Sequence, residues 1–307
     1  MIEEITRPHL DSLDDILELY RRAKNRSENY FFDHTWIEAV RARLKQDGFS
    51  GIVSRDNGAI SGIALYQSGP ETVYVHLIFV RRGEMRTRIF RELVNAIRDR
   101  HSRKLIMIAE PAPDFRIEDQ IRLFSECAFE VRQRFEMTRG ITIQKLGTAR
   151  PQGFQIKKYK SAYLKELNKL DREAYRGEAD ELLFRVNNDI SNSTPASKIV
   201  GSALGRFDKS LSEFIFRDKA LAGAVYCVAR GSDVLVANIA TACKYRKMGL
   251  ATLLLSRVLN RMGEQGYSGC RLFVSAENQK AINLYKKFNF KVERIRIYCV
   301  YRLGQGD

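Results

Sequence analysis

The sequence predicts an α/β protein built from two similar domains, and three observations support this fold class. The chain has 307 residues, more than a single hydrophobic core usually organises. Helix-like and strand-like patterns of apolar residues alternate in each half. Two segments of the first half also recur, in the same order, in the second half, which indicates a duplicated domain.

The repeat rests on two pairs of matching segments. Residues 80–97 (VRRGEMRTRIFRELVNAI) match residues 245–262 (YRKMGLATLLLSRVLNRM) at a spacing of 165 residues. Residues 120–131 match residues 281–292 at a spacing of 161 residues. Similar spacing in the same order is typical of tandem copies of one fold.

The boundary between the copies is marked by residues that break regular structure. Gly147, Pro151 and Gly153 follow one another closely between two patterned stretches. We therefore expect a first domain at residues 1–146, a linker at residues 147–153 and a second domain at residues 154–307.

The second half illustrates the predicted order of elements, and the first half follows a similar order. Apolar residues at helical spacing predict helices, and β-branched runs between turn residues predict strands. The predicted helices span residues 162–175, about 179–188, 249–262 and 279–287. The predicted strands span residues 213–217, 221–229, 234–242, 271–275, 291–297 and 298–303, the last two forming a terminal hairpin.

Composition limits the class of protein and its compartment. Apolar residues make up 44% of the chain and charged residues 29%, as in soluble globular proteins. Apolar runs such as residues 221–229 are shorter than the roughly 20 residues of a membrane helix. The acidic amino terminus is unlike a signal or transit peptide. We expect a cytoplasmic protein without a membrane partner.

The cysteines predict neither a metal site nor disulfides. They are odd in number and widely scattered, and no CxxC pair or histidine cluster accompanies them. We expect reduced core thiols in a cytoplasmic protein. The five are Cys127, Cys227, Cys243, Cys270 and Cys299.

The net charge of +15 is unevenly distributed. Residues 1–150 carry +3 and residues 151–307 carry +12, so we expect an anionic ligand to bind the second half. A nucleic acid is one alternative partner, because Arg86, Arg88 and Arg91 could form a basic stripe. Glutamates interrupt that stripe and no nucleic-acid-binding motif is present, so we do not expect this partner.

One strand-to-helix turn in the second half carries a signal for anion binding. Gly249 and Ala251 lie at the predicted helix start, where unpaired N–H groups and the helix dipole favour an anion. Their small side chains leave the backbone open to a pyrophosphate. Basic residues flank them. The segment consists of Arg246, Lys247, Met248, Gly249, Leu250, Ala251 and Thr252.

This segment resembles the signature of the GNAT superfamily of N-acyltransferases: Gln or Arg, two variable residues, Gly, one variable residue, then Gly or Ala. Residues 272–290 are similar to the later part of the same superfamily's core. They place Asn278, Ala281 and Tyr285 at helical spacing and end in Phe290. Asn289 stands where most members have Gly, and Asn tolerates the left-handed backbone better than other residues.

The resemblance implies two GNAT-like domains, each a mixed, mostly antiparallel central sheet flanked by helices. It implies acetyl-CoA as co-substrate and a primary amine, of a small metabolite or a peptide, as acceptor. The pantetheine arm would lie between strands 234–242 and 271–275, where one backbone N–H would polarise the thioester carbonyl. Tyr285 would protonate the leaving thiolate. The backbone of Ile239, Ala240 and Thr241, residues 246–252, Asn278 and Ala281 would bind the co-substrate.

The sequence does not identify a general base. Several members of the superfamily carry a glutamate early on the motif strand, but Leu235 stands there in this chain, with Asn238 three residues on. The ammonium must lose a proton before its lone pair can attack. The group that accepts this proton remains open: it could be an ordered water, a backbone carbonyl, or the side chain of Glu178, Asp180 or Glu181.

The first half lacks the residues that would carry this chemistry, so we expect a degenerate GNAT-like domain with a structural role. Long side chains replace the small ones of the motif, and a phenylalanine without a proton to donate replaces the tyrosine. Such a copy could take the place of the second subunit of a dimer. We therefore expect either a monomer whose two domains resemble a dimer, or a homodimer. The matched positions are Glu84 for Gly249, Arg86 for Ala251, about Ile117 for Asn278, and Phe124 for Tyr285.

Two functions of different classes fit the second half: an N-acetyltransferase, and a non-catalytic acyl-CoA-binding or regulatory module. A Tyr285→Phe substitution discriminates them, since it slows only the enzyme. The acceptor itself has no recognisable signature in the sequence. We expect its pocket to be formed by residues 175–197 and 298–301.

Overall fold

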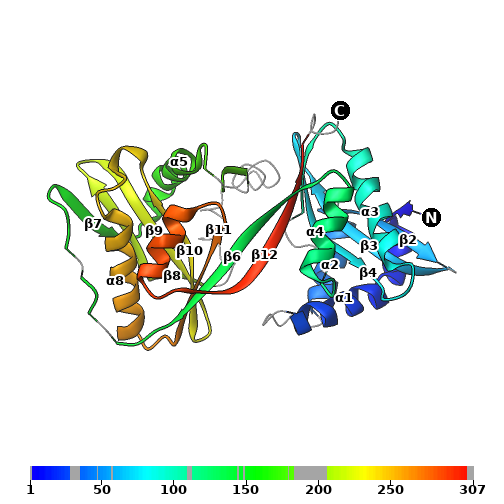
Figure 1. Ribbon diagram of the computed structural model, residues 1–307, viewed down its shortest axis with the longest axis horizontal. Coiled ribbons are helices and arrows are strands. Elements are labelled where there is room, and N and C mark those ends of the chain that lie inside the picture. The colour runs from blue at the N-terminus through cyan, green and yellow to red at the C-terminus, as the bar shows by residue number, and fades with distance from the viewer. Residues whose placement is uncertain are drawn as a thin grey trace. The chain divides into compact units, whose positions relative to one another are not determined.

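The computed structural model describes residues 2–27, 35–46, 48–56, 58–108, 113–143, 145–147, 149–178, 180–182 and 206–302 (Figure 1). The chain forms two compact units. The first consists of Met1–Gln133 with Ile297–Asp307, and the second of Arg134–Arg296. Each unit is an α/β structure with a central sheet, so the predicted fold class is confirmed.

The first unit is a mixed sheet with helices on both faces. Its strand order is β1-β2-β3-β4-β5-β12, and only β4 and β5 pair in parallel. The helices α3 and α4 cover one face, and α1 and α2 cover the other. Its elements are β1 (Ile2–Glu4), η1 (Arg7–Ser12), α1 (Asp14–Ser27), α2 (Thr35–Lys45), β2 (Ser50–Asp56), β3 (Ala59–Ser68), β4 (Thr72–Val80), α3 (Arg86–Arg100), β5 (Leu105–Ile108), α4 (Ile117–Glu126), the start of β6 (Glu130–Gly140) and the end of β12 (Lys291–Tyr301).

The second unit repeats this arrangement. Its strand order is β6-β11-β10-β9-β8-β7, and only β10 and β11 pair in parallel. The helices α8 and α9 cover one face, and α5 covers the other. Its elements are the rest of β6, β7 (Phe154–Lys158), η2 (Ser161–Tyr163), α5 (Leu164–Tyr175), β8 (Arg206–Arg217), β9 (Ala220–Arg230), β10 (Asp233–Thr241), η3 (Cys243–Tyr245), α8 (Leu250–Glu264), β11 (Gly269–Ser275), α9 (Gln279–Lys287) and the start of β12.

The repeat is visible in the backbone as well as in the sequence. Ala128 and Asn289 follow α4 and α9, and both adopt positive φ angles, of 64° and 60°. They lie 161 residues apart, which is the spacing of the second pair of matching segments. Asn289 therefore adopts the left-handed conformation expected of it, and Ala128 adopts it without the advantage of an Asn side chain.

Each unit takes one strand from the far half of the sequence. The second part of β6 pairs antiparallel with β11, from Arg134↔Ser275 to Gly140↔Gly269. The end of β12 pairs antiparallel with β5, from Tyr301↔Ile106 to Cys299↔Ile108. The units therefore differ from the expected division into residues 1–146 and 154–307, because the last strand of each sequence half completes the sheet of the other.

The predicted terminal hairpin at residues 291–297 and 298–303 is wrong. Lys291–Tyr301 forms one continuous strand. The run contains no Gly, Pro, Asn or Asp that would favour a turn. Because the strand continues, its last residues reach the first unit.

The other predicted elements of the second half fit the structure where it describes them. The helix α9 has the predicted bounds, and β8 begins seven residues earlier than predicted, at Arg206. Of the helix predicted at about 179–188, only residues 180–182 are described, and residues 183–197 of the expected acceptor pocket lie outside the described residues. Among the described helices, none is both long and apolar enough to cross a bilayer.

Candidate active site

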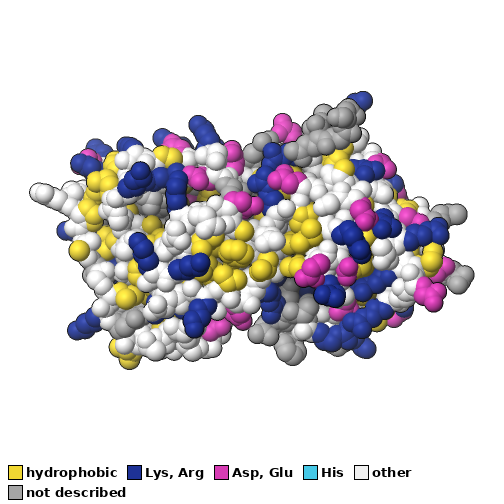
Figure 2. All heavy atoms as spheres, viewed as in Figure 1, with side chains coloured by type: hydrophobic (Ala, Val, Ile, Leu, Met, Phe, Trp, Pro, Cys, Tyr) yellow, Lys and Arg dark blue, Asp and Glu magenta, His cyan; other side chains and the backbone are white. Residues whose placement is uncertain are grey.

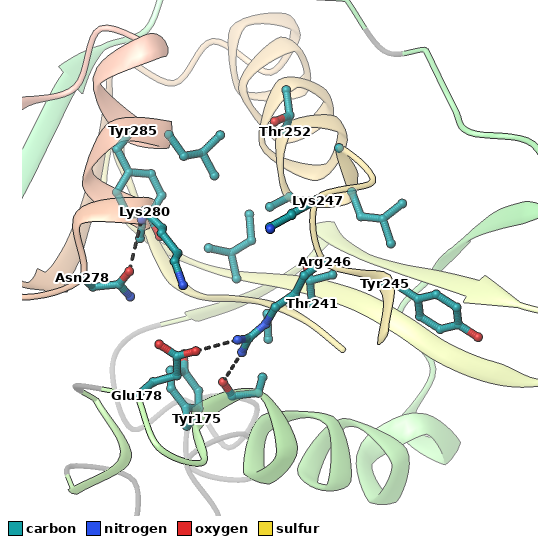
Figure 3. A pocket seen from close by; sticks show the side chains of 18 residues that line it. Tyr175, Glu178, Thr241, Tyr245, Arg246, Lys247, Thr252, Asn278, Lys280 and Tyr285 are labelled. Carbon is teal, nitrogen blue, oxygen red and sulfur yellow. Dashed lines mark hydrogen bonds and ion pairs between the residues drawn. The ribbon is translucent and has the colours of Figure 1, made fainter. Parts of the chain in front are cut away.

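A cavity of about 520 Å³ lies in the second unit between the starts of α8 and α9 (Figure 3). It opens where the sheet becomes irregular. β10 pairs with β11 from Asp233 to Leu235, and its register against β9 then shifts between Val236 and Asn238. The extra residue at Ala237 is a bulge, which bends a strand locally.

The structure brings the predicted site residues together around this cavity, with one exception. Met248 does not line it, and its side chain is 40% exposed. The predicted residues that line the cavity are Ile239, Ala240, Thr241, Arg246, Lys247, Gly249, Leu250, Ala251, Thr252, Asn278, Ala281 and Tyr285.

The turn before α8 has the backbone expected of an anion site. Gly249 is the N-cap of α8 and has a φ of 77°, a conformation that side chains with a Cβ rarely adopt. A Cβ at this position would meet no atom within 4 Å, so the glycine faces open space. Leu250 is 1% exposed and anchors the helix start in the core. The unpaired N–H groups of the first turn are thereby fixed in place.

Two lysines add positive charge to this site. Lys247 extends from the turn and Lys280 from the first turn of α9, into the space between the two helix starts (Figure 3). The side chain of Asn278 caps α9, because its Oδ1 accepts a hydrogen bond from the backbone N–H of Ala281 at 3.1 Å. The site therefore joins two cations to two helix starts, an arrangement that favours phosphate groups.

Tyr285 lies on the α9 wall of the cavity and is 6% exposed. Burial raises the pKa of its hydroxyl well above the usual range, and the negative charge of Asp180 adds to the shift. The ring packs edge-on against Phe290, with centroids 6.0 Å apart. Tyr285 therefore holds its proton at neutral pH and can donate it.

Arg246 has protein partners that the sequence did not indicate. Its Nη1 donates to Oε1 of Glu178 at 2.5 Å, and its Nη2 donates to the backbone carbonyl of Ala174 at 2.7 Å (Figure 3). The guanidinium therefore connects the turn before α8 to the segment after α5. Glu178, one of the acids considered as a base, is engaged in this ion pair.

The two other acids considered as a base also have partners. Glu181 accepts a hydrogen bond from the backbone N–H of Gly177 at 2.8 Å. Asp180 accepts one from the hydroxyl of Ser275 at 2.5 Å and lies 3.8 Å from Arg134. The charge of Asp180 raises the pKa of both Tyr175 and Tyr285, which places it near the two tyrosines of the cavity.

Six lining residues were not among the predicted co-substrate-binding residues or the predicted proton donor, although Tyr175 and Glu178 lie in the segment expected to form the acceptor pocket and Glu178 was one of the acids considered as a base. Lys280 and Leu284 follow from helical spacing around Ala281 and Tyr285, so the sequence contained a signal for them. The others come from the end of α5, the turn after it and η3, outside both motif segments. They are Ala174, Tyr175, Glu178 and Tyr245.

In the first unit, an arginine bridges the corresponding helix starts. The guanidinium of Arg86, on α3, lies over the ring of Phe115 at 3.7 Å. It donates to the backbone carbonyls of Asp114 at 3.2 Å and Pro113 at 3.4 Å, just before α4. Phe124 is fully buried in the core. The contacts of Arg86 agree with the expected loss of co-substrate binding in this copy, and Phe124 stands where the second unit has the hydroxyl of Tyr285.

The described residues hold no group of three or more His, Cys, Asp or Glu side chains that could bind a metal ion. The described residues include all five cysteines, and each of these thiols is free.

Comparison with known proteins places this cavity in a family context. Residues 164–290 match the model of the acetyltransferase (GNAT) family, and this segment contains every residue that lines the cavity. No curated protein matches the chain.

Solved structures share the fold of the whole chain. A GCN5-related N-acetyltransferase from Sphaerobacter thermophilus has a TM-score of 0.61 at 15% identity, covering 98% of this chain and 95% of its own. A tandem GNAT protein from the clavulanic acid biosynthesis pathway has a TM-score of 0.60 at 14% identity, and both chains are covered fully, at 100%. A glucosamine N-acetyltransferase region of a fungal multi-domain β-N-acetylglucosaminidase has a TM-score of 0.60 at 11% identity over 98% of this chain and 38% of its own. At these identities the likeness shows the fold alone.

Proposed function

We propose that the domain at residues 164–290, which matches the model of the GNAT acetyltransferase family, transfers an acetyl group from acetyl-CoA to a primary amine. The observation that carries the proposal is the single cavity that joins an anion-binding helix start to a buried tyrosine. Gly249 and Tyr285 lie on its opposite walls, on the two helices that the resemblance assigns to binding and to proton transfer.

The cavity fits the co-substrate at both of its ends. The charges of Lys247 and Lys280 and the N–H groups at Gly249 suit a pyrophosphate. The β10 wall, at Ile239–Thr241, offers backbone groups to a pantetheine arm. The hydroxyl of Thr241 is buried and has no hydrogen-bond partner among the described residues, so a ligand amide would satisfy it.

The proposed step forms one bond and breaks another. The lone pair of the free amine attacks the thioester carbonyl carbon, a C–N bond forms, and the C–S bond breaks. Tyr285 donates its proton to the departing thiolate, and the proton that the nitrogen loses is taken up by a base and returned to the Tyr285 oxygen, which is then neutral again. A backbone N–H of β10 stabilises the charge on the carbonyl oxygen while the new bond forms.

Of the three candidate acids, Asp180 best fits the role of the base that accepts the proton lost by the amine. Glu178 is bound to Arg246, and Glu181 is bound to a backbone N–H. Asp180 also has partners, the hydroxyl of Ser275 and Arg134, but of the three acids it alone raises the pKa of both Tyr175 and Tyr285. Its carboxylate is therefore close to the two tyrosines of the cavity, although Asp180 itself does not line it.

The first unit takes no part in the chemistry under this proposal. Arg86 fills the space between the helix starts, and Phe124 has no proton to donate. The basic residues of α3 also do not suggest a nucleic acid as substrate, because Arg88 pairs with Glu92 and Arg91 with Glu126, each at 2.8 Å. On the face drawn in Figure 2, Lys and Arg side chains lie interspersed with Asp and Glu.

The test is thiol release from acetyl-CoA with a panel of glucosamine, spermidine and a tetrapeptide with a free amino terminus. We expect amine-dependent release by the wild-type protein and about a hundredfold lower kcat in Tyr285→Phe, with unchanged CoA affinity. Tyr245→Phe is the matched control, because Tyr245 lines the same cavity but packs against Phe154, with centroids 5.5 Å apart. Binding of CoA without turnover for any amine would instead support a non-catalytic acyl-CoA-binding module.

A further inference from the structure

Behind the cavity lies a buried polar network whose hydrogen bonds among the described residues include none from Lys or Arg. Asp171 on α5 is fully buried. Its Oδ2 accepts a hydrogen bond from the hydroxyl of Tyr226 at 2.5 Å, and its Oδ1 accepts one from Nδ2 of Asn238 at 2.9 Å. Nδ2 of Asn238 also donates to the Tyr226 oxygen at 2.6 Å. Buried networks that are fully hydrogen-bonded hold their members in one arrangement.

The network reaches the cavity through one residue. The hydroxyl of Tyr175, one helical turn after Asp171, donates to Oδ1 of Asn238. Tyr175 lines the same cavity as Tyr285. Asn238 directly follows the bulge in β10, so the irregular part of the strand directs an amide side chain toward α5.

The direction of each hydrogen bond follows from the carboxylate. An ionised carboxylate only accepts, so Tyr226 must donate to it and Asn238 must turn its NH₂ group toward it. The carbonyl oxygen of Asn238 then faces Tyr175. Because a phenol has one proton and Tyr175 gives it to Asn238, the Tyr175 oxygen can only accept hydrogen bonds from the cavity.

We infer that Asp171, acting through Tyr226 and Asn238, sets the orientation of the Tyr175 hydroxyl so that its oxygen accepts a hydrogen bond from the N–H group of the acceptor amine. This inference rests on the proposed acetyl transfer and assigns a binding residue, Tyr175, and a positioning residue, Asp171, to it. The substrate class that fits is a primary amine, which donates hydrogen bonds while its lone pair attacks.

Protonation of Asp171 would reverse this arrangement. Its new O–H group needs an acceptor, and rotation of the Asn238 amide supplies one. The NH₂ group then faces Tyr175, whose proton turns toward the cavity and opposes an N–H donor. Burial raises the pKa of Asp171 from its ordinary value of 3.8 to about 7, while the bonds from Tyr226 and Asn238 oppose the shift.

The groups that hydrogen-bond to Asp171 are Tyr226 from β9 and Asn238 from β10, and Tyr175, on the same helix as Asp171, bonds to Asn238 and is affected by the charge of Asp171. Farther toward the cavity, Asp180, Tyr285 and Arg134 act on Tyr175. No other charged group is in hydrogen-bond contact with Asp171 among the described residues. Within the hydrogen-bonded network, the rotation of the Asn238 amide therefore depends on the protonation of one carboxyl group, that of Asp171.

The test compares Asp171→Asn and Tyr175→Phe with the wild-type protein, using the amine from the panel with the highest turnover. We expect KM for the amine to rise about tenfold in both variants at pH 8, the loss of one hydrogen bond, while KM for acetyl-CoA is unchanged. The wild-type KM should also rise as the pH falls through about 7, relative to Asp171→Asn, which cannot titrate. The titration of the amine itself is common to both proteins and cancels in the ratio.

Asp208→Asn is the matched control, because Asp208 is also buried, at 5% exposed, but bonds to Ser210 and Tyr267 outside the cavity. Thermal melts confirm that each variant is folded at the assay temperature. An unchanged amine KM and a constant KM ratio across pH in an active protein overturn the inference and leave the proposed function standing. A wild-type protein that releases no thiol with any amine overturns both.

Discussion

Oε1 of Glu178 lies 2.5 Å from Nη1 of Arg246, the arginine that the GNAT signature places next to the co-substrate. The same guanidinium donates to the backbone carbonyl of Ala174. Arg246 therefore has two roles to separate: it holds the segment after α5 and it contributes charge to the cavity. Both side chains are about one-third exposed, at 38% and 33%, so the ion pair itself adds little stability.

Substitution of the two partners separates these roles. We expect Arg246→Ala to raise KM for acetyl-CoA about tenfold, because a charge-assisted hydrogen bond to phosphate is lost. Glu178→Gln should lower that KM by about twofold to threefold, since it removes a carboxylate that competes with phosphate for the guanidinium. Steady-state kinetics measure both values. If the two variants raise KM equally, Arg246 acts only by holding Glu178.

The raised pKa of Asp171 predicts how the stability of the folded protein depends on pH. In the unfolded chain its carboxyl group loses its proton near pH 3.8, whereas in the folded protein it keeps the proton until about pH 7. Between these values the folded state holds more protons, so a rise in pH favours unfolding. The stability that the protonated carboxyl group of Asp171 gives to the folded state is therefore fully lost above about pH 7.

Asp171→Asn removes this titration. We expect the free energy of unfolding of the variant, relative to the wild type, to rise by about 4 kcal/mol between pH 4 and pH 7 and to stay level above it. Urea unfolding at a series of pH values measures the difference. A difference that is constant over this range would show that Asp171 is ionised throughout.

The contacts of Arg86 occupy the place that the co-substrate would take in the first unit, and we expect them to stabilise that unit. Arg86→Ala should lower the free energy of unfolding by about 1 to 2 kcal/mol, because it removes a cation–π contact and two hydrogen bonds to backbone carbonyls. Acetyl-CoA turnover should be unchanged. Arg88→Ala is the control on the same helix: its side chain is 69% exposed, and we expect a loss below about 0.5 kcal/mol. A fall in turnover in Arg86→Ala would contradict a purely structural role.

The exchanged strands predict that neither half of the sequence folds well alone. Residues 1–146 keep β4 beside β5 but lack β12, which pairs with the other edge of β5. Residues 154–307 keep β10 beside β11 but lack β6, which pairs with the other edge of β11. Each fragment would expose an unpaired sheet edge, which promotes aggregation. We expect insoluble fragments when they are expressed separately and a soluble 1:1 complex when they are expressed together, measured by size-exclusion chromatography. A soluble, monomeric and fully active 154–307 fragment would contradict the exchange.

Local patterns predicted most of the second unit and most of its site. The bounds of α9 and the position of Gly249 follow from helical spacing and from the turn chemistry of the motif, which act over a few residues. The residues on β10, α8 and α9 line one cavity because strand and helix periodicity fix which side chains share a face.

Long-range pairing was not predictable in the same way. Nothing in the run at residues 291–301 shows which strand it joins, and the missing turn residue was the only sign that it does not fold back on itself. The pairing of Arg246 with Glu178 and the network at Asp171 also depend on contacts between elements about 70 residues apart, as the separations of 68 and 67 show. The acids proposed as a base could not be ranked until their hydrogen-bond partners were known.

Calorimetric titration of CoA tests most directly whether the second unit holds the active site. The protein should bind about one CoA per chain, and Gly249→Val should abolish binding by placing a branched side chain in the open space at the α8 start. Gly231→Val is the matched control: Gly231 has a φ of 60° in a turn of the same unit, so it carries similar backbone strain away from the cavity. Lost binding in Gly249→Val with intact binding in Gly231→Val is the predicted result. Unchanged CoA affinity in a folded Gly249→Val protein would contradict the assignment of the site.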